Sequence, residues 1–162
     1  MFKDIDGVEY NNVNCLSCSI NDGTLKPFGG ILYRSKSFVV SQDFELPING
    51  FIIISPIRHV CFLNELENDE LSEFMLLTNK VIKILKEFNV TKNYNIILEE
   101  KDNIHLHLWC MPSSKWMIDR FGKVLKNVKA IQDYSMEHMR DEENKKEILS
   151  TCEYLRKRLN ED

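Results

Sequence analysis

The segment that most constrains this chain is residues 103–112, Asn-Ile-His-Leu-His-Leu-Trp-Cys-Met-Pro. Its residue types alternate, and the side chains of an extended strand point to opposite faces with a period of two. The alternation predicts a strand with one chemically active face and one apolar face that packs on a helix: His105, His107 and Trp109 against Leu106, Leu108 and Cys110. We expect the strand to end at Pro112, because proline has no N–H to donate to a neighbouring strand.

Two imidazoles held side by side on a strand suit metal binding, proton transfer or nucleophilic attack. The alternative is a surface strand that carries two histidines without a function, since an H-x-H pattern alone is a weak signal. The rest of the chain has to decide between these interpretations.

Composition limits the classes of protein to consider. A chain of 162 residues that is 43% hydrophobic and 28% charged is typical of one soluble globular domain. The net charge of −4 argues against binding to a nucleic-acid duplex or to a membrane surface. Apolar runs such as residues 51–54 are far too short to span a membrane, and the first residues do not resemble a signal peptide.

The five cysteines also carry information about location. An odd number argues against a framework of disulfide bonds. We therefore expect a cytoplasmic protein with reduced thiols.

The pattern of hydrophobic residues predicts an α+β fold with a mainly antiparallel sheet, one long helix between strands and a helical C-terminal tail. Two expected strands form a hairpin, and the buried strand after it leads directly into Arg58 and His59. Asn68 is expected to cap the long helix and Asn89 to end it. The expected strands are 31–34, 37–41, 51–55, 94–98 and the histidine segment, and the expected helices are 68–88, about 128–139 and 141 onward.

Two cysteines and two of the histidines form a complete set of zinc ligands. Cys15-Leu-Ser-Cys18 supplies two thiolates, and two histidines from His59 and His105-Leu-His107 supply two imidazoles, which together suit tetrahedral zinc. A redox-active cysteine pair is the rival interpretation. That rival requires a βαβ unit, and here a polar segment precedes the motif and no parallel unit follows it.

Together these motifs resemble the histidine triad (HIT) family of nucleotide-binding hydrolases and transferases. The resemblance covers roughly residues 15–112. It rests on the C-x-x-C motif with Ser19-Ile20, the hairpin from Ile31 to Asp43, the stretch from Asn49 to Val60, and His105-Leu-His107-Leu-Trp109-Cys-Met-Pro112. Residues 1–112 would form the HIT-like nucleotide-binding domain, and residues 113–162 a helical extension packed on the same domain.

The resemblance implies a role for each motif. His107 would attack the α-phosphate of a nucleotide and form a covalent nucleotidyl-imidazole. Asp43 stands where the family places a ribose-binding aspartate, although a turn-capping role is the equal alternative. The zinc would be structural, because all four of its ligands are protein groups: Cys15, Cys18, His59 and His105.

The sequence departs from the family pattern at two places. The family signature has a histidine where this chain has Trp109, which cannot exchange protons with a leaving group. The loop 99–103 carries two glutamates, which would repel phosphate unless they turn away. We expect Asn103 and Trp109 to contact the nucleotide, and Lys115 and Trp116 to reach back over the site.

Three functions follow for comparison. The first is an enzyme that acts on a dinucleoside polyphosphate or a related nucleotide through His107. The second is a zinc-braced nucleotide-binding protein with little or no turnover. The third is an interaction domain whose amphipathic tail binds a protein partner. No nucleic-acid duplex or membrane partner is expected, and a homodimer is compatible with the resemblance.

Overall fold

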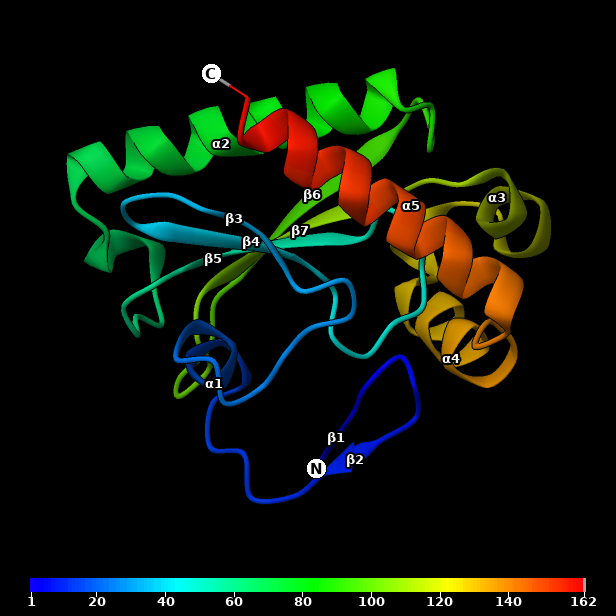
Figure 1. The fold of residues 1–162 in the computed structure, drawn as a ribbon, viewed down its shortest axis with the longest axis horizontal. Coiled ribbons are helices and arrows are strands. Elements are labelled where there is room, and N and C mark those ends of the chain that lie inside the picture. The colour runs from blue at the N-terminus through cyan, green and yellow to red at the C-terminus, as the bar shows by residue number, and fades with distance from the viewer. Residues whose placement is uncertain (162) are drawn as a thin grey trace.

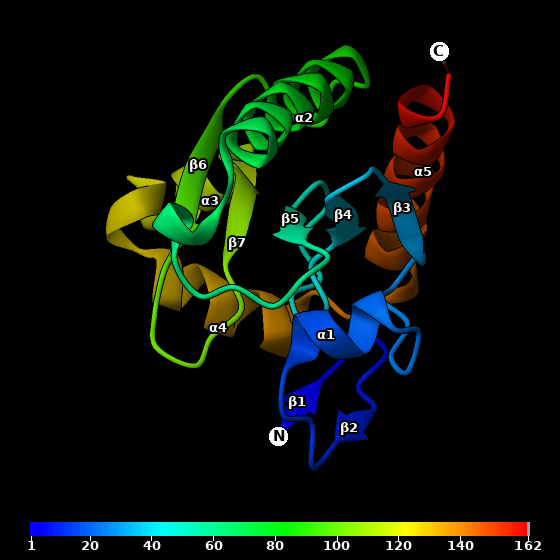
Figure 2. The ribbon, with the colours of Figure 1, turned by 90° about the vertical axis from the view of Figure 1, so that its left-hand side faces the viewer.

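The computed structural model describes residues 1–161, in which a five-stranded antiparallel sheet has helices on both faces (Figures 1 and 2). The strand order is β3–β4–β5–β7–β6, and a two-stranded hairpin lies apart from this sheet. None of the helices within residues 1–161 has the length and apolar character needed to cross a membrane. The strands are β1 (Phe2–Lys3), β2 (Glu9–Tyr10), β3 (Ile31–Arg34), β4 (Phe38–Gln42), β5 (Ile52–Pro56), β6 (Tyr94–Glu99) and β7 (His107–Pro112). The helices are α1 (Leu16–Asn21), α2 (Asn68–Glu87), α3 (Lys115–Phe121), α4 (Val128–His138) and α5 (Glu142–Leu159), with short 3₁₀ turns at Leu63–Glu65 and Val124–Lys126.

The predicted fold class is confirmed, with small shifts at the ends of elements. The long helix includes Asn68 as its first residue, so the cap position falls one residue earlier, on Glu67. The helix ends at Glu87, and Asn89 then adopts a positive φ of 62°, a left-handed conformation that asparagine tolerates at helix ends. Asp141 caps α5 as expected, because its side chain accepts a hydrogen bond from the Asn144 N–H.

The histidine segment differs from the prediction at its start. Strand β7 begins at His107, so His105 lies in the preceding turn and not on the strand. The cause is a tight turn in which Asn103 has a φ of 63°, after which the Leu106 N–H bonds to the Val60 carbonyl. The predicted alternation of faces nevertheless continues through this turn, because Leu106 joins the apolar core while His105 faces the other side.

The two faces of the sheet have different roles. Helices α2 and α5 cover one face and bury the main core with Leu106, Leu108 and Cys110 of the histidine segment (Figures 1 and 2). On the other face, α3 and α4 pack over one end of the sheet, around Phe51 and Trp109. Helix α1 and the β1–β2 hairpin lie on that same side (Figure 2). The histidines therefore face a space between α1 and α4.

Helix α5 also closes one edge of the sheet. The Arg156 guanidinium donates hydrogen bonds to the carbonyls of Gly29 and Ile31, and the Asn160 amide donates to the Leu32 carbonyl. The apolar side of α5 lies in the main core, with Ile148, Cys152, Leu155 and Leu159 all buried. Because this surface is already covered, the idea that an amphipathic tail binds a protein partner loses its main support.

We predict that Gly29→Ala destabilises the protein more than Gly23→Ala does. Both glycines have a positive φ, 76° and 84°, which costs an alanine about 1 kcal/mol. A Cβ on Gly29 would also lie 2.9 Å from the Cys152 Sγ of α5, whereas no described atom lies within 4 Å of a Cβ on Gly23. We expect losses of about 2–4 kcal/mol and about 1 kcal/mol respectively in urea unfolding. Equal losses of stability in the two variants would show that close packing of α5 against Gly29 does not limit the size of the residue there.

Candidate functional site

Two cysteines and two histidines meet at one point, as the sequence predicted. The donor atoms of Cys15, Cys18, His59 and His105 all lie within 4.8 Å of one another. Each cysteine Sγ is 3.3–3.5 Å from the Nδ1 atoms of both histidines. Zinc bonds of about 2.3 Å to sulfur and 2.0–2.1 Å to nitrogen in a tetrahedron place sulfur and nitrogen about 3.6 Å apart. The four residues therefore fit a structural zinc site in both chemistry and spacing.

Local structure holds these donors in place. Cys15 caps helix α1, where its sulfur accepts a hydrogen bond from the Cys18 N–H, so one short turn sets the spacing of both thiols. The Asn21 amide donates to the carbonyls of Pro56 and Ile57, which ties α1 to the end of β5. His105 also bonds to the Pro56 carbonyl, through Nε2 at 2.8 Å. With its proton fixed on Nε2, the ring presents Nδ1 to the thiols, as a metal-binding histidine with a carbonyl partner does.

The protonation tendencies of the donors agree with a metal site. Burial lowers the pKa of His105, which favours the neutral imidazole that binds metal. Burial, a hydrogen bond that the Cys18 thiol donates to Cys15, and the negative charge on Cys15 raise the pKa of Cys18 to about 11. Two adjacent thiolates are therefore unfavourable without a cation between them, and zinc supplies that positive charge.

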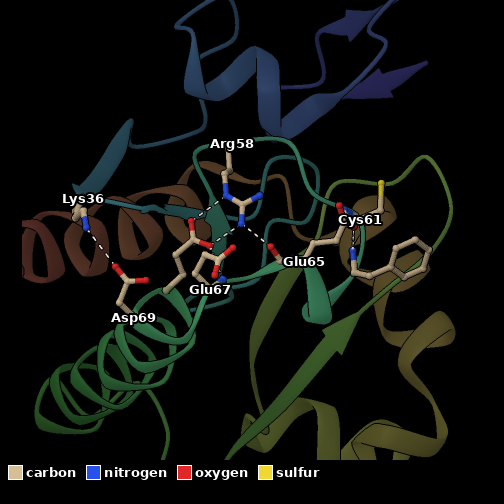
Figure 3. Close-up of polar contacts among 8 residues, drawn as sticks. Lys36, Arg58, Cys61, Glu65, Glu67 and Asp69 are labelled. Carbon is tan, nitrogen blue, oxygen red and sulfur yellow. Dashed lines mark hydrogen bonds and ion pairs between the residues drawn. The ribbon is translucent and has the colours of Figure 1, made fainter.

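The turn that carries His59 is fixed to helix α2 by charged groups (Figure 3). Arg58 contacts both carboxylate oxygens of Glu70, at 2.9 and 2.6 Å, and also donates to the Glu65 carbonyl. The Glu65 side chain accepts hydrogen bonds from the N–H groups of Cys61 and Phe62. The hydrogen bond from Arg58 lowers the pKa of Glu70 to about 2, so this pairing persists throughout the neutral range. The Arg58 side chain thus turns away from the site, and its neighbour His59 points into it.

A cavity of about 390 Å³ lies beside the zinc ligands. This volume falls in the range of small-molecule sites. His105, His107 and Trp109 all line it, and so do Asp43 and Asn103, so the structure brings together all of the nucleotide-binding residues that the sequence predicted. Helix α1 forms one wall, and Gln132 and Met136 of α4 form another.

His107 has both ring nitrogens occupied. Its Nδ1 lies 2.9 Å from the His105 carbonyl, and its Nε2 lies 3.1 Å from a carboxylate oxygen of Glu99. The His105 carbonyl can only accept a hydrogen bond, so Nδ1 carries a proton, and Nε2 becomes available for chemistry only when its contact with Glu99 is broken. The expected backbone carbonyl that fixes the tautomer is present. The contact with Glu99 was not expected, because the sequence suggested that the two loop glutamates would repel a ligand or turn away.

Asp43 caps a turn and also faces the cavity. One of its carboxylate oxygens accepts hydrogen bonds from the N–H groups of Glu45 and Leu46, which is the turn-capping role. The same side chain lines the cavity. Burial raises its pKa to about 6, although the two backbone hydrogen bonds oppose the shift. A carboxyl with a raised pKa in a cavity is a marker of functional sites.

The two residues that were expected to reach back over the site do not do so. Lys115 and Trp116 do not line the cavity: Lys115 is exposed and pairs with Asp119, and Trp116 packs against Phe121 and Tyr134. The reason is that α3 packs into the apolar cluster at the end of the sheet through Met117, while Gln132 and Met136 of α4 line the cavity. Sequence reasoning missed Gln132 and Met136, because an amphipathic helix does not reveal which of its polar residues faces a cavity.

Comparisons with known proteins agree with this geometry. No protein-family model matches the chain. A curated relative, an uncharacterised HIT-like protein of Methanocaldococcus jannaschii, is 23% identical over 120 residues, and the match covers 70% of this chain and 91% of the relative. A zinc-bound histidine triad family protein from Mycobacterium smegmatis superimposes with a TM-score of 0.60 and 16% identity, covering 87% of this chain and 94% of the other. The fold is that of the histidine triad proteins.

A second solved structure supports the histidine triad fold independently. It is a hypothetical histidine triad nucleotide-binding protein from Sulfolobus tokodaii, with a TM-score of 0.60, 20% identity, and coverage of 87% of this chain and 93% of the other. Both matches extend well beyond the segment that suggested the resemblance. The resemblance and the α+β fold class predicted from sequence are confirmed.

We predict one zinc ion per chain, held by the four donors. Cys18→Ser should remove the zinc and lower the free energy of unfolding by several kcal/mol, because metal-binding energy contributes to folding. Cys61→Ser is the matched control, since Cys61 lies 3.6 Å from the far nitrogen of His59, Nε2, outside the donor set. Elemental analysis and urea unfolding of protein purified without added metal measure both effects. Wild-type protein without zinc would contradict the assignment.

We predict that Asp43→Asn stabilises the protein at neutral pH. The pKa of Asp43 is about 6 in the folded state against an ordinary value of 3.8. The folded state thus binds this proton more tightly, and the stability it confers is lost as the pH rises through about 6. Asparagine keeps the acceptor for Glu45 and Leu46 without the charge. Its advantage over wild type should widen by about 1 kcal/mol between pH 5 and pH 7.5 in urea unfolding.

The matched control for this comparison is Asp102→Asn, because Asp102 is exposed and lies outside the cavity. It should follow the wild-type pH profile. If the profile of Asp43→Asn also matched that of wild type, ionisation of Asp43 would not cost the folded state anything.

Proposed function

We propose that the chain binds a nucleotide in this cavity and acts on its α-phosphate through His107, as a nucleotide hydrolase or nucleotidyltransferase. The observation that carries the proposal is the orientation of His107. Its Nδ1 is held by the His105 carbonyl, and its Nε2 faces a cavity large enough for a nucleoside monophosphate unit. The zinc ligands support this assignment, because His105 is one of them and its carbonyl orients His107.

The proposed reaction has two displacement steps. After Glu99 has moved away with any proton that it shares with Nε2, the lone pair of Nε2 forms a bond to the α-phosphorus, and the bond to the leaving group breaks with its electron pair on that group. Water, or another acceptor, then attacks the phosphorus, loses a proton, and returns the bonding pair to Nε2. Nδ1 keeps its proton and its hydrogen bond to the His105 carbonyl throughout. Dividing one difficult displacement into two easier ones is the advantage of a covalent intermediate.

The nucleoside part of the ligand would lie against the cavity wall that the early strands and α1 form. We assign the ribose to Asp43, whose side chain uses one carboxylate oxygen to accept hydrogen bonds from Glu45 and Leu46 and has a second oxygen that a ribose hydroxyl could contact. Asn103 and Trp109 would contact the remainder of the nucleotide. Dinucleoside polyphosphates and related nucleotides are the substrates that the family resemblance implies. Cytoplasmic location and a homodimer remain predictions.

A second candidate is a zinc-braced nucleotide-binding protein with little or no turnover. Two observations favour it. The Glu99 carboxylate contacts Nε2 of His107, the nitrogen that would attack phosphorus, and Trp109 occupies the position where the family has a third histidine. The Trp109 ring packs edge-on against Phe51, with 5.5 Å between the ring centroids, and its indole has no acid–base chemistry to offer a leaving group.

We predict that His107→Asn abolishes turnover but leaves zinc content, folding and nucleotide affinity close to wild type. The reason is that only Nε2 forms the covalent bond, whereas the metal depends on His105. His105→Ala should instead lose zinc and stability. The assay is a panel of dinucleoside polyphosphates, nucleotide sugars and nucleoside phosphoramidates, with intact mass to detect a nucleotidyl adduct. Full activity of His107→Asn would refute the mechanism, while nucleotide binding without turnover in wild type would favour the second candidate.

A further inference from the structure

Glu99 is placed beside His107 by the sheet itself. It is the last residue of β6, and in the antiparallel pairing of β6 with β7 it stands directly opposite His107. Directly opposite residues point to the same face of a sheet and lie close enough for their side chains to interact. The contact is therefore a consequence of strand register and does not depend on a chance loop conformation.

The contact takes the one nitrogen of His107 that the backbone leaves available. With Nδ1 bonded to the His105 carbonyl, Nε2 is the remaining site, and a carboxylate oxygen of Glu99 lies 3.1 Å from it. A phosphorus atom in line for attack needs the same position. Glu99 and a phosphate therefore cannot occupy it together, and a ligand has to displace the carboxylate.

The charges around the cavity increase the importance of this carboxylate. Asp43, Glu45 and Glu99 line the cavity, and among residues 1–161 no lysine or arginine does. An incoming phosphate thus meets several acidic groups. Asp43 is held by two backbone N–H groups, whereas the Glu99 side chain is 42% exposed and has rotatable bonds that let it swing toward solvent.

We propose that Glu99 is a gate over His107 that determines which phosphates reach it. The carboxylate covers Nε2 until a ligand displaces it, and an anion without other contacts in the cavity is repelled. A phosphate joined to a nucleoside can displace the gate, because the nucleoside part contributes binding free energy elsewhere in the cavity. The second half of this inference rests on the proposed nucleotide function. The first half, coverage of His107 by Glu99, does not.

The first experiment measures access to His107 without any nucleotide. Diethyl pyrocarbonate acylates uncovered imidazole nitrogens, and peptide mass spectrometry reports each histidine separately. His138 is an internal reference with a half-exposed side chain. At fixed pH we expect His107 of wild type to react at least several-fold more slowly than His138, and Glu99→Ala to remove most of that difference. Zinc content and circular dichroism of each variant verify that the fold is retained.

The second experiment measures the effect on anions. We expect Glu99→Gln, which keeps the size of the side chain, to bind nucleoside 5′-monophosphates and pyrophosphate about tenfold more tightly than wild type does, because a repulsive charge is removed. The parent nucleosides should bind unchanged. Asp102→Asn is the matched control, since it removes a carboxylate from the loop that follows Glu99 but lies outside the cavity.

The outcomes separate the gate from the function. Unchanged labelling of His107 in Glu99→Ala would overturn the gate, and so would monophosphate affinities that do not respond to Glu99→Gln in a protein that binds nucleotides. If labelling and pyrophosphate affinity respond as expected but no nucleoside or nucleotide binds to any variant, the gate stands and the nucleotide function fails. Equal responses in Asp102→Asn would reduce the effect to general charge and also overturn the gate.

Discussion

Two backbone carbonyls orient the chemistry of this protein. The Pro56 carbonyl holds Nε2 of His105 and so turns Nδ1 toward the two thiols, while the His105 carbonyl holds Nδ1 of His107 and so turns Nε2 toward the cavity. His105 thus presents Nδ1 to the thiols, whereas His107 presents Nε2 to the cavity. The zinc ligands and the proposed nucleophile are coupled through a single peptide group, because the residue that would bind metal with its ring orients His107 with its backbone.

This coupling gives the metal site a role in precision. A loose turn before β7 would let the His105 carbonyl move, and the tautomer of His107 would no longer be defined. Two contacts hold this turn. The Leu106 N–H donates a hydrogen bond to the Val60 carbonyl, and the turn that contains Val60 is itself fixed to α2 by the pairing of Arg58 with Glu70. A site whose parts must agree within fractions of an ångström benefits from such support around the residues that touch the ligand.

Much of the fold and the metal site could be predicted from sequence, because each depended on local patterns. Alternation in residues 103–112 indicated the two faces of β7, and ligand types with C-x-x-C spacing indicated the zinc set. Three features could not be predicted. The start of β7 depended on the left-handed turn at Asn103, the Glu99 contact on the register between β6 and β7, and the wall formed by Gln132 on how α4 docks. Each of these is a property of tertiary geometry that no short segment encodes.

The cavity wall combines the first residues of the chain with helix α4, and this has a consequence for synthesis on the ribosome. Phe2 and Met136 line the same space, and Arg140 donates hydrogen bonds to the carbonyls of Asp4 and Glu45. The metal ligands are all translated by residue 105, whereas the wall from α4 emerges about thirty residues later. Since folding during translation proceeds from the N-terminus, a nascent chain can close its metal centre while the ligand cavity is still unfinished. Metal capture would then precede completion of the cavity.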